Sequence, residues 1–141
     1  FTLRFEGSYL QKMDHVEIQG ENPFSLIKFN VNPRFRGNTT LRWRKDNWNA
    51  SVSYYYISET EEPDVTDTEG NDWIIGSSQR VNVTLGYRFT EGMLDGLSAS
   101  LGIRNIFDED PPLNPSERRA YETGLHSNRE RFFYVDLKYR F

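Results

Sequence analysis

The chain has 141 residues, of which 36% are hydrophobic, 15% aromatic and 27% charged, and its net charge is -4. The absence of cysteine excludes a disulfide scaffold, a cysteine-ligated zinc site and thiol catalysis. No apolar run reaches the roughly 18 residues that a transmembrane helix needs, and the aromatic content argues against disorder. Many aromatic residues in a polar chain favour strands on which apolar and polar side chains alternate.

Six segments show this alternation and are predicted to be strands: residues 1–9, 34–44, 48–56, 80–89, 97–104 and 133–141. The pattern is clearest in residues 80–89, where every second residue from Val81 to Phe89 is apolar and the residues between them are polar or glycine. No segment shows a sustained helical period. The predicted fold class is therefore all-β, an antiparallel up-and-down meander of about six strands.

The connections between these strands alternate in length. Residues 45–47 and 90–96 form short turns, whereas residues 11–33, 57–79 and 105–130 form long loops. Short turns at one rim and long loops at the other are typical of outer-membrane barrels, and structureless loops of about 20 residues are uncommon in compact domains. The pattern predicts a segment of a large transmembrane β-barrel.

The two faces of the predicted sheet differ in chemistry. Aromatic residues gather near the short turns on the apolar face, as in the interfacial girdle of a barrel: Trp43, Trp48, Tyr87, Phe89, Tyr139 and Phe141. The opposite face is basic: Arg34, Arg36, Arg42, Arg44, Arg80, Arg88, Arg104, Lys138 and Arg140. So many cations cannot be buried in a core without large desolvation costs, so this face is expected to line a lumen.

Two features at the end of the chain carry a resemblance to a known family. Residues 105–112 read Asn-Ile-Phe-Asp-Glu-Asp-Pro-Pro, and the final alternating strand ends on Phe141. This combination resembles the C-terminus of TonB-dependent outer-membrane receptors. The resemblance implies that residues 1–141 are the C-terminal segment of a receptor barrel of about 22 strands that is filled by an N-terminal plug. That plug is absent from this sequence.

The resemblance also implies function and partners. The function would be TonB-dependent uptake of a scarce nutrient (a ferric siderophore, cobalamin or an oligosaccharide) at the bacterial outer membrane, with the long loops extracellular. The partners would be outer-membrane lipid and lipopolysaccharide, the rest of the barrel and its plug, and the TonB complex acting through the plug. The barrel-assembly machinery would read the last strand through Leu137, Tyr139 and Phe141.

Neither an enzymatic activity nor a cofactor is expected. The sequence contains no nucleophile elbow, P-loop or dinucleotide fingerprint. Its acidic balance argues against a nucleic-acid partner.

Candidate substrate-binding residues lie in the long loops and the upper lumen. Phe24, Trp73 and Tyr121 could stack on sugar rings or catechols. Arg34 and Arg36, nearer the outer rim, could attract an anionic ligand. The arginines near the short turns are expected to contact the plug instead: Arg42, Arg44, Arg88 and Arg140.

Residues 59–72 contain seven carboxylates and no lysine or arginine. A solvated acidic loop is the simpler interpretation. The alternative is a divalent-cation site with Asp64, Asp67 and Glu69 as candidate ligands, because clustered carboxylate oxygens suit Ca²⁺. The spacing does not match an EF-hand.

Two other folds compete with the receptor segment. A complete eight-stranded outer-membrane barrel with a structural or adhesive role would need additional strands within residues 24–31 and 73–75. A soluble β-sandwich could instead bind carbohydrate through its aromatic residues, with its apolar face on a core.

Overall fold

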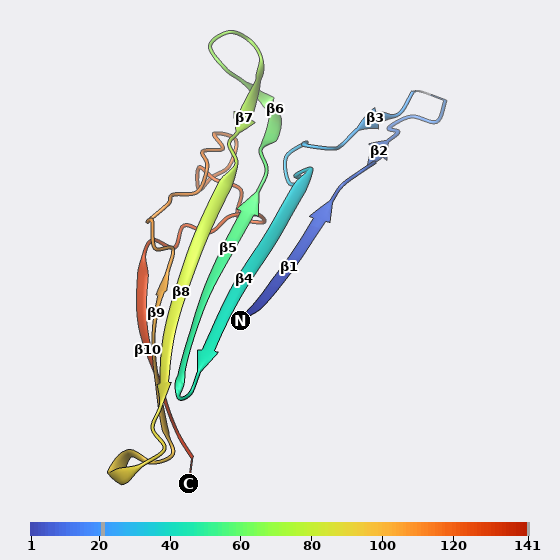
Figure 1. Cartoon of the computed structure of the whole chain (residues 1–141). Helices are drawn as coiled ribbons and strands as arrows, with labels where there is room; N and C mark the ends of the chain where they lie inside the picture. Colours follow the sequence, from blue (N-terminus) through green and yellow to red (C-terminus); the bar gives the residue numbers. More distant parts are fainter. Residues whose placement is uncertain (21, 141) are drawn as a thin grey trace.

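The computed structural model describes residues 1–20 and 22–140 and is dominated by one antiparallel sheet of six strands (Figure 1). Its strand order is β1-β4-β5-β8-β9-β10, so each strand pairs with its predecessor in the meander. The strands are β1 (Thr2–Tyr9), β4 (Phe35–Lys45), β5 (Trp48–Ile57), β8 (Ser78–Arg88), β9 (Leu97–Arg104) and β10 (Phe132–Tyr139). The predicted all-β meander is confirmed. The prediction that the last strand reaches Phe141 falls outside the described residues.

Two small ladders occur within the long loops. β2 (Asp14–His15) pairs with β3 (Phe24–Ser25), and β6 (Thr60–Thr66) pairs with β7 (Asp72–Ile75). The alternating pattern does not predict them, because two strands are only two residues long and β6 is largely polar with a register shift inside it. The segments that an eight-stranded barrel requires do contain strands, but β3 and β7 do not join the main sheet.

Strand register places like side chains in continuous rows across the sheet. One apolar row crosses all six strands: Leu3, Leu41, Val52, Val83, Ile103 and Phe133. The adjacent row is mostly polar: Thr2, Arg42, Ser51, Thr84, Gly102 and Tyr134. Because a one-residue slip would exchange the two faces, this register is strongly determined by the sequence pattern.

The apolar face of the main sheet is uncovered. Leu3 and Val135 keep 69% and 64% of their surfaces exposed, and Leu101 keeps 61%. Among the described residues the buried hydrophobic side chains are Ile75 and Tyr121, and both lie outside this sheet. A soluble sandwich would need a second layer over this face, and the described chain provides none.

The two ends of the sheet differ as predicted. Figure 1 shows the long loops gathered at one end and the turns after β4 and β8 at the other, where the C-terminus also lies. The second turn contains the 3-10 helix η1 (Gly92–Leu94) and Gly96, whose φ is +85°. A Cβ on Gly96 would lie 2.5 Å from the carbonyl oxygen of Arg140, so only glycine fits there. No helix in residues 1–20 and 22–140 is long and apolar enough to cross a membrane.

Candidate functional site

The polar face of the sheet is hollowed near the long loops, where a pocket of about 1010 Å³ opens. Its floor comes from β5, β8, β9 and β10, and its far wall comes from the end of the 105–131 loop. Four arginines line it together with a single acidic residue: Arg80, Arg104, Arg129, Arg131 and Glu130. The pocket therefore combines an open volume with an excess of positive charge.

Two of these arginines are held by neighbouring groups. The Nη2 atom of Arg80 donates a hydrogen bond of 2.9 Å to the carbonyl oxygen of Ser127. Its Nε atom is buried and has no hydrogen-bond partner. The Arg104 guanidinium lies 5.4 Å from the ring centroid of Tyr134, within the range of a cation–π interaction.

The Tyr134 ring crosses β9 at a glycine. A Cβ built on Gly102 would lie 2.1 Å from the ring, so glycine leaves room for the tyrosine on the polar face. The hydroxyl of Tyr134 is 3.0 Å from the Thr84 hydroxyl on β8. The Tyr134 ring therefore lies over Gly102 and beneath the Arg104 guanidinium, and its hydroxyl is held by Thr84.

Asn105, the first residue of the 105–112 motif, fastens the start of the long loop to its end. Its side-chain Nδ2 donates to the carbonyl oxygens of Glu109 and Arg129 at 2.9 and 3.1 Å, and its Oδ1 accepts from the Glu109 amide at 3.0 Å. Its own amide donates to Asn82 Oδ1 on β8 at 3.0 Å. Its φ is +52°, a left-handed conformation that asparagine tolerates well. Asn105 is 1% exposed.

The aspartate of the same motif adds a second fastening. Asp108 Oδ1 accepts a hydrogen bond of 2.5 Å from the Arg131 amide, and the Arg131 guanidinium lies 3.7 Å from Asp108 Oδ2. The motif therefore bends the chain back so that residues 127–131 reach the polar face. Sequence reasoning identified the motif but missed this role, which depends on contacts across more than twenty residues.

The third long loop is also joined to the second. Glu62 Oε2 accepts hydrogen bonds from Ser116 Oγ at 2.8 Å and from Asn114 Nδ2 at 3.3 Å. Glu62 is 2% exposed and Asn114 is fully buried. The Trp73 indole donates to the carbonyl oxygen of Leu113 at 3.0 Å. The 105–131 loop is thus anchored to the β6–β7 ladder as well as to the sheet.

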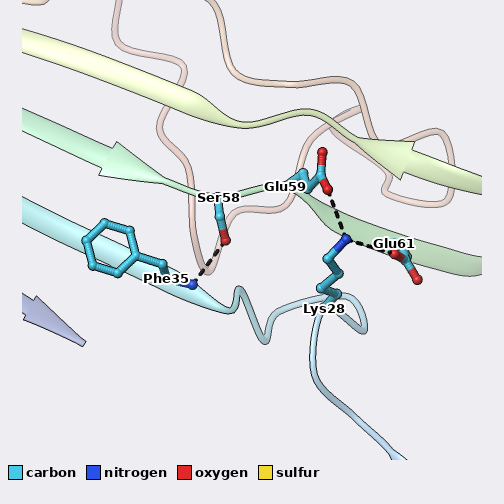
Figure 2. Close-up of polar contacts among 5 residues, drawn as sticks. All are labelled: Lys28, Phe35, Ser58, Glu59 and Glu61. Carbon is cyan, nitrogen blue, oxygen red and sulfur yellow. Dashed lines mark hydrogen bonds and ion pairs between the residues drawn. The ribbon is translucent and has the colours of Figure 1, made fainter. Parts of the chain in front are cut away.

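The first long loop joins the same ladder from the other side, as Figure 2 shows. Lys28 Nζ lies 2.9 Å from Glu59 and 3.4 Å from Glu61, and the hydrogen bond with Glu59 is the main cause that raises the pKa of Lys28. The Ser58 hydroxyl accepts a hydrogen bond of 3.1 Å from the Phe35 amide. Residues 58–62 therefore connect all three long loops.

A histidine lies where the 105–131 loop meets β8. His126 Nδ1 is 3.1 Å from the Ser78 hydroxyl, and its amide donates to the Glu122 carbonyl oxygen at 2.9 Å. Burial lowers the pKa of His126, and the nearby Arg80 lowers it further, while Glu122 raises it. The neutral imidazole is the form that fits this position.

The aromatic residues predicted to contact substrate lie apart from the pocket. Phe24 packs edge to face against His15, with ring centroids 5.5 Å apart. Trp73 makes the contact with Leu113, and Tyr121 is only 7% exposed. Their part in substrate binding stays a prediction.

The two predicted rim arginines face β1. Arg34 Nη1 donates to the Tyr9 hydroxyl at 3.3 Å, and Arg36 Nε donates to the Ser8 hydroxyl at 3.2 Å. The lining of the pocket contains neither of them. Their part in ligand binding also stays a prediction.

The acidic segment is not the uniformly solvated loop that its composition suggests, since Glu62 is buried. Asp67 Oδ1 accepts hydrogen bonds from the amides of Asn71 and Glu69 at 3.0 and 2.8 Å, and these bonds lower the pKa of Asp67. Asp64, Asp67 and Glu69 do not converge: in residues 1–20 and 22–140, no three histidine or carboxylate side chains are grouped as a metal site.

The short-turn end has an aromatic cluster on its apolar face and a charged hollow on its polar face. The rings of Trp48 and Tyr87 have centroids 4.6 Å apart, and those of Tyr87 and Phe89 are 4.9 Å apart. The hollow, of about 490 Å³, is lined by both cations and acids, including Arg44, Arg88, Lys138, Asp46 and Asp136.

An antiparallel meander with one uncovered apolar face, a polar inner face and two unlike rims defines a β-barrel segment of the outer-membrane class. A family model described as TonB dependent receptor-like, beta-barrel matches residues 1–106. Because the match covers well over half of the chain, the protein belongs to this family. Its members are outer-membrane transporters rather than enzymes. Searches of curated proteins and of solved structures found no match.

Proposed function

We propose that this chain is the C-terminal barrel segment of a TonB-dependent receptor for a scarce nutrient, and that the pocket beside the 105–131 loop forms part of its ligand site. The observation that carries the proposal is the position of this pocket. It lies on the polar face, at the long-loop rim, beside a loop that Asn105 and Glu62 hold in place.

In this proposal the long loops face the outside of the cell, and the apolar face contacts lipid and lipopolysaccharide. The mixed charges of the short-turn hollow contact the plug, on which the TonB complex acts. Leu137 and Tyr139 lie on the apolar face of the last strand. In this proposal the barrel-assembly machinery recognises them together with Phe141. The nutrient is a ferric siderophore, cobalamin or an oligosaccharide, and no cofactor takes part.

The test is uptake by cells that carry the intact receptor, with each nutrient class offered in labelled form. Ser53 and Val52 are neighbours on β5 whose side chains lie on opposite faces, and Ser53 lines the pocket. Ser53→Trp should narrow the pocket and reduce uptake at least tenfold, while Val52→Trp should leave uptake unchanged. Immunoblots of the outer-membrane fraction establish equal receptor levels.

Two results would contradict the proposal. Uptake that persists in cells lacking TonB would reject the receptor function itself. Equal uptake by the Ser53→Trp and Val52→Trp variants, at equal levels, would reject the pocket as part of the ligand path.

A further inference from the structure

We infer that the ligand of this pocket is a multiply charged oxyanion, one that presents two or more carboxylate or phosphate groups to Arg80, Arg104 and Arg129. This inference rests on the proposed function and narrows its substrate class. The family assignment allows both ligands rich in anionic oxygens and neutral oligosaccharides. The inference selects the first of these two classes.

The first argument is the placement of the cations. Arg80 belongs to β8, Arg104 to β9, and Arg129 to the end of the 105–131 loop, yet all three line one pocket. Bringing like charges together from separate elements costs free energy. An anion bound among the three arginines would turn this repulsion into a net attraction. Guanidinium groups also match carboxylate and phosphate oxygens in paired hydrogen bonds.

The second argument is that these charges are not compensated within the chain. In the described residues, neither Arg80, Arg104 nor Arg129 makes an ion pair, whereas Arg131 does so with Asp108. Glu130 is the single acid in the pocket lining. Without Arg131, which Asp108 pairs, three cations and one acid leave a local excess of two positive charges.

The third argument is preorganisation. The Tyr134 ring holds the Arg104 guanidinium from one side, and Gly102 and Thr84 fix the ring. The Asn105 hydrogen bond to the Arg129 carbonyl oxygen fixes the backbone that carries the third cation. Cations held in place before binding lose less entropy when the ligand arrives.

The inference is tested by calorimetry on the intact receptor in detergent, with trigalacturonic acid and inorganic tripolyphosphate as charged probes and maltotriose as the neutral probe. We expect at least one charged probe to bind and maltotriose to give no heat. The two charged probes distinguish a carboxylate source from a phosphate source. Arg80→Gln and Arg104→Gln should each weaken the binding about tenfold, which corresponds to about 1.4 kcal/mol.

Arg42→Gln is the matched control, because Arg42 lies on the same polar face but outside the pocket lining. Its probe affinity should equal that of the unaltered receptor. An equal loss in Arg42→Gln and Arg80→Gln would show a diffuse surface attraction and overturn the inference. So would an Arg80→Gln variant that loses thermal stability but keeps its probe affinity, because the arginine would then pair with the plug.

The outcomes also separate the inference from the function on which it rests. A receptor that performs TonB-dependent uptake of a neutral nutrient, but binds neither charged probe, would reject the oxyanion and leave the receptor function standing. Uptake that is independent of TonB would reject the receptor function, whichever probe binds.

Discussion

The carboxylate of Glu62 accepts a hydrogen bond of 2.8 Å from the hydroxyl of Ser116, although the two residues are 54 positions apart in the sequence. Glu62 belongs to the acidic β6–β7 ladder and Ser116 to the loop beside the arginine pocket. The pair shows that part of the acidic segment serves to hold a neighbouring loop. A buried carboxylate needs such donors, because burial without them is costly.

Replacing Glu62 by alanine should loosen the 105–131 loop. The change removes the acceptor of the buried Asn114 side-chain amide, and leaving a buried donor unpaired costs about 1–3 kcal/mol. The Ser116 hydroxyl keeps its contact with Asn114 Oδ1. Hydrogen exchange of the intact receptor should therefore speed up in residues 113–117, by a factor of about 5 to 150 if exchange follows loop opening. Glu69→Ala, at an exposed position of the same segment, is the control. Equal exchange in the two variants would show that the Glu62 contact does not hold the loop.

Asn105→Ala should release the end of the 105–131 loop from its start. The substitution removes three side-chain hydrogen bonds, each worth about 1 kcal/mol, and places alanine at a φ of +52°. One of these bonds reaches residues 127–131, at Arg129, so we expect the docking of that segment to weaken by about 1 kcal/mol, measured as faster exchange of the Arg131 amide. Asn105→Gly keeps the backbone conformation accessible and loses only the hydrogen bonds. A smaller effect for glycine would therefore measure the backbone contribution, and full protection in both variants would contradict the fastening role.

The sequence predicts the main sheet well because apolar and polar side chains alternate strictly along it. This period of two residues determines where the strands lie and which side chains share a face. The loop contacts carry no such period. Glu62 and Asn114 are buried only because their partners arrive from another loop, so composition suggested a solvated segment. Tyr121, predicted as a substrate contact, is likewise buried, and no alternating pattern indicates this. Arg80 was recognised as a cation of the polar face, but its place in a pocket depends on the bend at Asn105.

Docking of the 105–131 loop should weaken as the pH falls below about 6.5. Burial and the charge of Arg80 lower the pKa of His126, so the docked loop prefers the neutral imidazole. A lowered histidine pKa means that the undocked state binds more protons. The contribution of the neutral His126 side chain to docking is therefore complete above the ordinary histidine pKa of about 6.5. It is lost as the pH falls through the lowered pKa of the docked state.

The measurement is protease accessibility of residues 119–131 in the intact receptor between pH 8 and pH 5. Glu122, Glu109 and Asp110 also face this region and carry ionisable carboxyl groups. His126→Gln, which has no imidazole to protonate, should remove the transition that follows the lowered histidine pKa. An unaltered transition in the His126→Gln variant would assign the pH dependence to another group.

Trp48 should lie at the lipid interface. It belongs to the apolar face, keeps 45% of its surface exposed and packs against Tyr87 near the short turns. Tryptophan prefers the zone between hydrocarbon and water, so lipids brominated on their acyl chains should quench its fluorescence. Trp73, in contrast, donates to a carbonyl oxygen within the long loops and should be shielded from lipid. The comparison uses Trp48→Phe and Trp73→Phe variants of the intact receptor in vesicles. Loss of quenchable emission in Trp48→Phe, with no change in Trp73→Phe, is the expected result, and the reverse would place the apolar face away from the membrane.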